Sequence, residues 1–206
     1  MSEFVELRPH NINSKTIVEI VQVLRNGGLA IIPTDSIYAI VGDLLHRDVM
    51  EKICRLLEKK PSHANLSILC KDLSSLSEYT SPISNPTYKV MNRLLPGPFT
   101  FILKASNNVP KIFRQNKKTI GIRVPDNEIC QAIISELGNP LVCSSIHSED
   151  EIQEYLTEPQ EIFEVWQNKV AYIVDGEAGH NVGTTVIDAS EGELELIREG
   201  LGIELL

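Results

Sequence analysis

The segment AIIPTDSIYAIVG, residues 30–42, is an apolar run that a short polar patch interrupts. Its first residues, 30–32, are small or β-branched and are typical of a buried strand. The polar residues Thr34, Asp35 and Ser36 follow, and apolar side chains then resume. Polar groups at the end of a buried strand lie where loops converge on a ligand. The segment therefore predicts a strand whose end contributes to a binding site.

The composition is typical of a soluble globular protein. The chain has 206 residues, of which 42% are hydrophobic, enough to bury one substantial core. We predict a single domain over residues 1–206. The apolar runs are far shorter than the ~20 residues that cross a bilayer, and the first residues lack the basic start of a signal peptide. We expect a cytoplasmic protein with no membrane partner.

Charge and cysteine content limit the possible functions further. The net charge of -9 opposes non-specific attraction to RNA, so any nucleotide site requires a local basic patch. The cysteines lie far apart, with no CxxC motif or Cys/His cluster that would bind zinc. We predict buried free thiols and no metal site for Cys54, Cys70, Cys130 and Cys143.

Periodicity and turn residues predict alternating helices and strands. A first helix begins with Ser14 as its cap and ends at Gly27, and further helical segments are expected at 48–57, 72–79, 87–94, 128–137 and 159–166. Strands are expected at 29–32, 66–70, 100–104, 119–125, 141–143, 171–174, 184–188 and 195–198. Several strands are joined by short turns, which favours an α/β (α+β) fold with a twisted mixed sheet and helices outside it.

Two arginines and two lysines stand out as candidate ligand contacts. Arg123 and Arg198 place a guanidinium within apolar strands, where either a salt bridge to a carboxylate or an anionic ligand would compensate the charge. Lys59 and Lys60 follow a predicted helix, and with the arginines they would form a cationic wall suited to phosphate.

Several common catalytic motifs are missing from the sequence. It contains neither GxxxxGK[ST] nor a GxGxxG segment after a strand, which argues against P-loop and Rossmann nucleotide sites. Ser144, Ser145 and His147 lie close together, but no GxSxG elbow accompanies them. Nucleophilic catalysis is therefore disfavoured, and no residue is assigned as catalytic.

Six segments occur in a fixed order along the chain. They are PTDSIYAIVGD (33–43), PGPFTFIL (96–103), IGIRVPDN (120–127), GNPLVCSSIHS (138–148), TTVID (184–188) and IREG (197–200). Together they resemble the successive motifs of the YrdC/YciO-like family over about residues 14–203. The resemblance implies a YrdC/RibB-like fold, a twisted mixed sheet with flanking helices and a large concave cleft.

The resemblance also implies a reaction. Well-understood members of the family are L-threonylcarbamoyl-AMP synthases, which combine L-threonine, bicarbonate and ATP and release pyrophosphate, with Mg²⁺ expected on the phosphates. The product leads to the threonylcarbamoyl modification of adenosine 37 in tRNA. Matched position by position, the family pattern assigns threonine contacts to Thr34, Tyr38 and Arg123, and nucleotide or phosphate contacts to Lys59, Lys60, Ser145, His147, Thr185 and Arg198.

Two departures from the synthase pattern make the chain more similar to the YciO branch. Glu58 and Lys60 stand where the synthases have the Lys and Arg of a K-x-R-P motif, which weakens the grip on phosphates unless Lys59 compensates. His147 stands where the S-x-N motif of the synthases has Asn. A histidine can donate a hydrogen bond as asparagine does, but it titrates near neutral pH.

An alternative function is non-catalytic binding of double-stranded RNA, tRNA or a nucleotide. An RNA groove would need the cations of the chain to gather on one face, whereas the net negative charge favours scattered, solvated cations. The candidates are Lys52, Arg55, Lys59, Lys60, Lys89, Arg93, Arg114, Lys117, Lys118 and Arg123.

Overall fold

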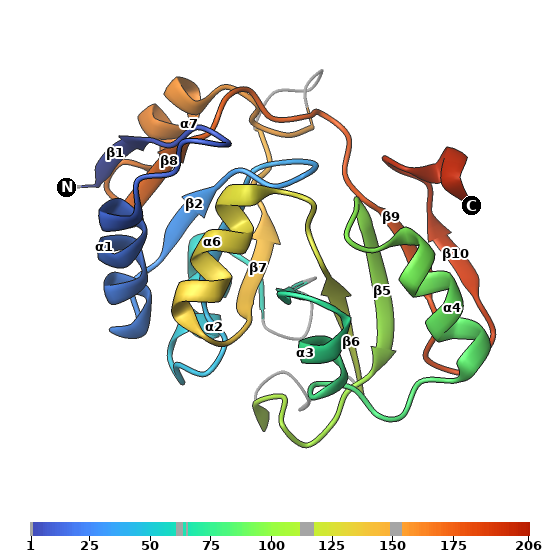
Figure 1. The fold of residues 1–206 in the computed structure, drawn as a ribbon. Helices are drawn as coiled ribbons and strands as arrows, with labels where there is room; N and C mark the ends of the chain where they lie inside the picture. The colour runs from blue at the N-terminus through green and yellow to red at the C-terminus, as the bar shows by residue number, and fades with distance from the viewer. Residues whose placement is uncertain (1, 61–63, 65, 112–117, 149–153) are drawn as a thin grey trace.

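The structure is a computed structural model that describes residues 2–60, 64, 66–111, 118–148 and 154–206. Its strands form one sheet, in the order β1-β8-β2-β3-β7-β4-β6-β5-β9-β10 (Figure 1). The bounds are β1 Glu3–Glu6, β2 Ala30–Ile32, β3 Ala39–Asp43, β4 Ser67–Leu69, β5 Phe99–Lys104, β6 Thr119–Arg123, β7 Leu141–Ser145, β8 Tyr172–Asp175, β9 Thr185–Asp188 and β10 Glu195–Arg198.

The sheet is mixed, as the sequence predicts. Strands β1 and β2 run parallel to β8, β4 runs parallel to β6 and β5 runs parallel to β9. The other neighbours, including β2 with β3 and β9 with β10, are antiparallel. Two strands lie where the sequence analysis placed none: β1 at one edge of the sheet, and β3, formed by the apolar residues that resume after the polar patch.

Local side-chain hydrogen bonds begin most of the helices. The helices are α1 Ser14–Arg25, α2 Val49–Leu56, α3 Leu73–Ser77, α4 Asn85–Leu94, α6 Glu128–Leu137 and α7 Pro159–Trp166, with a 3₁₀ turn at Ile203–Leu205. Asn13 caps α1, so Ser14 is the first helical residue rather than the predicted cap, and Asp48 precedes α2 without a capping bond from its side chain. Asn127 caps α6, and Gly138 ends it with a φ of 83°.

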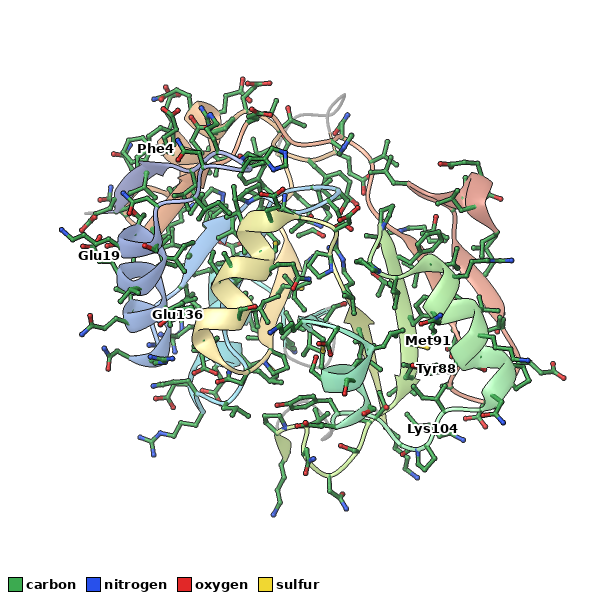
Figure 2. All side chains as sticks on the ribbon, viewed as in Figure 1. Phe4, Glu19, Tyr88, Met91, Lys104 and Glu136 are labelled. Carbon is green, nitrogen blue, oxygen red and sulfur yellow. The ribbon has the colours of Figure 1, made fainter. Side chains whose placement is uncertain are left out.

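Helices α1 and α6 lie side by side over one half of the sheet (Figure 1). Ile20 of α1 and Ile133 of α6 are fully buried in the cluster that joins the helices to this face. Glu19 and Glu136 lie on the outer surfaces of the same helices (Figure 2). This division of each helix into an apolar and a polar side explains why both pack against the sheet.

The face that α1 and α6 cover continues as the floor of a cavity. Cys143 of β7 belongs to the cluster under the two helices. The same face extends along the sheet, because Ser67 of β4 pairs with Cys143 and with Gly121 of β6. The adjacent residues Ile68 and Ile122 are buried in the core cluster of the opposite face. Side chains alternate between faces along a strand, so one side of these strands is apolar and the other is small and polar.

The remaining helices cover the opposite face. Met91 of α4 is fully buried in the core cluster of this opposite face, to which Ile68 and Ile122 also belong. Tyr88, on the preceding turn of α4, is 45% exposed (Figure 2). The four cysteines are buried and free, which confirms the predicted buried thiols. Within the described part of the chain, none of the helices has the length and the apolar character that crossing a membrane requires.

Candidate functional site

A cavity of about 590 Å³ lies above the polar face of the sheet. Ser67, Thr100 and Gly121 contribute to its floor. A side chain at Gly121 would bring its Cβ within 2.6 Å of the Ser67 Oγ atom, so glycine keeps this floor open. Of the residues predicted for the site, the walls carry Lys59, Arg123, Ser145, His147 and Arg198.

Arg123 is held at the cavity wall by the polar segment that follows β2. The residue is 6% exposed, and its Nη2 atom donates to Asp35 Oδ1 at 2.6 Å and to Ser36 Oγ at 3.0 Å. Asp35 also accepts a hydrogen bond from the backbone N–H of Asp126 at 3.0 Å. The salt bridge considered for Arg123 is therefore present. Its buried Nε atom has no hydrogen-bond partner among the described residues.

Thr34 and Ser36 shape the turn that presents Asp35. The Thr34 hydroxyl donates to the carbonyl of Ile37 at 2.7 Å and accepts from the backbone N–H of Ser36 at 3.1 Å. It also accepts from Arg123 Nη2 at 3.3 Å. Thr34 thus lies behind Arg123 rather than in the cavity lining. Its contact with threonine stays a prediction.

Tyr38 connects the start of β3 with the loop that follows β8. Its side chain is fully buried, and its hydroxyl donates to the carbonyl of Glu177 at 2.6 Å and accepts from the N–H of Gly176 at 3.0 Å. Burial raises the pKa of Tyr38 well above its ordinary value, so the phenol remains protonated. In this arrangement the hydroxyl stabilises the loop, and its predicted contact with threonine remains a prediction.

Replacing Tyr38 with phenylalanine is expected to lower the free energy of unfolding by about 1–3 kcal/mol, because one backbone donor and one acceptor lose their partner. Urea denaturation measures this change. Tyr172→Phe on β8 is the matched control, and we expect a smaller effect there. An unchanged midpoint for Tyr38→Phe would show that the two hydrogen bonds do not support the fold.

Lys59 enters the cavity because of the way in which α2 ends. Glu58 has a φ of 53°, in the left-handed region, and the N–H of Lys59 donates to the carbonyl of Cys54 at 2.9 Å. Both lysines are exposed, but this turn places Lys59 in the cavity lining, and Lys60 does not line it. The two lysines that the sequence analysis treated alike therefore differ in position.

Arg198 lies at the end of β10, where a bulge interrupts the pairing with β9. Its Nη2 atom donates to the carbonyl of Thr184 at 2.9 Å, and the Thr184 hydroxyl is 2.7 Å from that of Thr100. Thr185 is fully buried and does not line the cavity. Its hydroxyl donates to the carbonyl of Leu201 at 2.9 Å. Thr185 thus anchors the C-terminal segment behind Arg198, and its nucleotide contact stays a prediction.

His147 and Tyr155 form an aromatic pair at the cavity wall. Their ring centroids are 5.0 Å apart, and an isolated antiparallel bridge joins their backbones. Burial lowers the pKa of His147 below its ordinary value, and the charge of Lys59 lowers it further. Glu154 and Tyr155 also line the cavity, but the sequence analysis missed them because they precede α7 in a segment without periodicity.

The described residues of the cavity offer hydrogen-bond donors and positive charge. Cys143 lines it, but burial raises the pKa of this thiol to about 11, so the thiol is neutral at pH 7. Asp35 compensates the charge of Arg123, which leaves Lys59 and Arg198 as cations against the carboxylate of Glu154. Such a site can bind and orient an anionic ligand.

Comparison with known proteins relates this arrangement to a family. The family model Sua5_yciO_yrdC, described as "Telomere recombination", matches residues 22–200. The uncharacterized protein YciO of Escherichia coli K12 is 36% identical over 204 residues, which is 98% of this chain and 97% of that protein. A putative threonylcarbamoyl-AMP synthase of Methanocaldococcus jannaschii is 30% identical over 178 residues, 85% of this chain and 81% of that protein.

Solved structures show the same fold. The crystal structure of E. coli YciO matches with a TM-score of 0.90 at 35% identity and covers 98% of this chain and 97% of that one. The P. abyssi Sua5 structure in complex with L-threonine matches with a TM-score of 0.87 at 24% identity, over 97% of this chain and 58% of that one. Sequence and structure agree, and the chain belongs to the Sua5/YciO/YrdC family.

Proposed function

We propose that the chain catalyses formation of L-threonylcarbamoyl-AMP from L-threonine, bicarbonate and ATP, with release of pyrophosphate, and so contributes to the modification of adenosine 37 in tRNA. The observation that carries this proposal is a single cavity whose lining combines Arg123 with Lys59, Ser145 and Arg198. The name of the M. jannaschii relative, a putative threonylcarbamoyl-AMP synthase, supports the same reaction.

The reaction joins two anionic partners. The threonine nitrogen attacks the carbon of bicarbonate, or of CO₂ formed from it, to give a carbamate, and the oxygen lost from bicarbonate leaves as water. A carbamate oxygen then attacks the α-phosphorus of ATP, and the bond from that phosphorus to the bridging oxygen breaks. Pyrophosphate leaves with the electron pair. No side chain has to form a covalent bond, so the protein contributes positioning and charge stabilisation.

The side chains in the cavity fit these requirements. Arg123 would donate from its guanidinium to the threonine carboxylate, while Asp35 keeps the guanidinium in place. Lys59, Ser145 and Arg198 would contact the phosphates. The described residues contain no group of three or more His, Cys, Asp or Glu side chains that could hold a metal ion, so Mg²⁺ would arrive on the oxygens of the triphosphate.

Mass spectrometry of the adenylate product tests this proposal. The purified protein is incubated with L-threonine, ATP, Mg²⁺ and ¹³C-labelled bicarbonate. We expect a threonylcarbamoyl adenylate that carries the label, and none when threonine is omitted. Arg198→Ala should reduce its yield with little change in the unfolding midpoint, because the side chain is exposed. A complete absence of labelled adenylate would contradict the proposal.

RNA binding finds no comparable support. The cations considered for it lie on separate elements: Lys52 and Arg55 line a second hollow, Lys89 and Arg93 belong to α4, and Arg123 is buried. Two of the other candidates, Arg114 and Lys117, lie outside the described residues. Binding of double-stranded RNA or tRNA, which would require these cations to share one face, stays a prediction.

A further inference from the structure

His147 lies among the charged groups of the cavity and is the one cavity-lining side chain, among those described, that titrates near neutral pH. It follows the end of β7, and its ring packs against Tyr155 at 5.0 Å with an interplanar angle of 34°. The bridge between His147 and Tyr155 fixes the backbone on both sides of this contact. The imidazole is therefore held at the wall.

The groups that face His147 come from three parts of the fold. Lys59 follows α2, Arg198 ends β10, and Glu154 and Tyr155 lie in the segment before α7. Burial lowers the pKa of His147 first, and the charges of Lys59 and Arg198 lower it further. Glu154 acts in the opposite direction, through its charge and a backbone hydrogen bond. With no ligand in the cavity, His147 is therefore neutral at pH 7.

We propose that His147 takes up a proton from solvent when an oxyanion such as a phosphate group occupies the cavity beside Lys59 and Arg198. This inference rests on the proposed phosphate-binding use of the cavity, but it does not require that catalysis takes place. The added proton turns the neutral imidazole into a third cation beside Lys59 and Arg198. This third cation is present only while the anionic ligand is bound.

The physical basis is the reversal of the local field. Two unit charges about 6 Å apart interact by about 3 kcal/mol at an effective dielectric constant of about 20, equivalent to about two pH units, and exposure to water reduces this. A bound anion thus offsets the effect of Lys59 and Arg198 on His147. We expect the pKa of His147 to rise by about one unit on binding, which limits the gain in affinity at low pH to about tenfold.

The residue type explains why this coupling belongs to this chain. An asparagine at position 147, as in the synthase pattern, can donate a hydrogen bond but cannot acquire charge. Glu58 and Lys60 supply no cation to the cavity lining, and His147 replaces part of the missing positive charge when a ligand binds. The residues at the end of α2 and His147 after β7 thus both affect the positive charge of the cavity.

Nuclear magnetic resonance of the imidazole groups tests the proposal. The Cε1–H signals of the ¹³C-labelled histidines are followed through a pH titration, with sodium sulfate or with sodium chloride at equal ionic strength. Sulfate keeps both charges throughout this titration, so any proton taken up belongs to the protein. His147→Asn assigns the signal. His10→Asn is the matched control, because His10 pairs with Glu128 outside the cavity. Its backbone has a φ of 62°, which asparagine also adopts readily.

The expected result is a His147 pKa below 6.5 in chloride that rises by about one unit in sulfate, while the other histidines stay unchanged. Sulfate affinity should then increase as the pH falls from about 7.5 towards that value, and His147→Asn should remove the dependence. An unchanged His147 pKa at saturating sulfate, or failure of sulfate to bind, overturns the proposal. If the shift occurs without any pyrophosphate release, this inference stands and the proposed function fails.

Discussion

Replacing Arg123 with methionine is expected to lower the free energy of unfolding by about 3–5 kcal/mol and to reduce threonine-dependent activity by at least about a hundredfold. The loss of stability follows because the Asp35 side chain, which is 5% exposed, would keep a buried charge without its partner. The loss of activity follows because the cavity would lose the donor that we assign to the threonine carboxylate. Urea denaturation and pyrophosphate release measure the two effects.

The double variant Arg123→Met, Asp35→Asn separates these effects. It removes both charges, so we expect most of the lost stability to return, since neither side chain then carries an unpaired buried charge. Activity should remain as low as in the single variant. Recovery of activity together with stability would show that Arg123 acts only on the fold and does not contact substrate.

The second large effect concerns Lys59 and Lys60, which differ in position by one residue. Lys59→Ala is expected to weaken ATP binding by about ten- to a hundredfold, because a hydrogen bond between charged groups contributes about 1.5–3 kcal/mol. Lys60→Ala should change ATP affinity by less than about twofold, since the side chain does not line the cavity. Isothermal titration calorimetry measures both constants.

The two variants control for each other, because each removes one lysine and both therefore have the same net charge. Equal losses in both would indicate that ATP responds to the general field of the α2 terminus rather than to a contact. A larger loss in Lys60→Ala would contradict the position of Lys59 that the turn at Glu58 creates.

Elements with strong local signals could be predicted from the sequence. The helix predicted at 128–137 matches α6, because apolar spacing, the Asn127 cap and Gly138 all mark it locally. Strand β10 was also placed at its observed residues. The sequence analysis does not predict strand β1, because its pairing with β8 joins segments far apart in the chain.

The site could be predicted as a set of residues but not as a geometry. The sequence placed polar groups at the ends of strands and considered a salt bridge for Arg123, but it could not identify Asp35, 88 positions away, as the partner. It also could not distinguish Lys59 from Lys60, because a single left-handed residue decides which of them enters the cavity. Tyr155 and Glu154 lacked any periodic signal, since tertiary contacts place them.

The most direct test of the account is the rate of pyrophosphate release by the purified protein, measured with and without L-threonine in the presence of bicarbonate, ATP and Mg²⁺. We predict release that requires threonine and falls to background in Arg123→Met, Asp35→Asn, the variant in which stability is preserved. Release that is absent, or that proceeds equally without threonine, would contradict the proposed synthesis of threonylcarbamoyl-AMP.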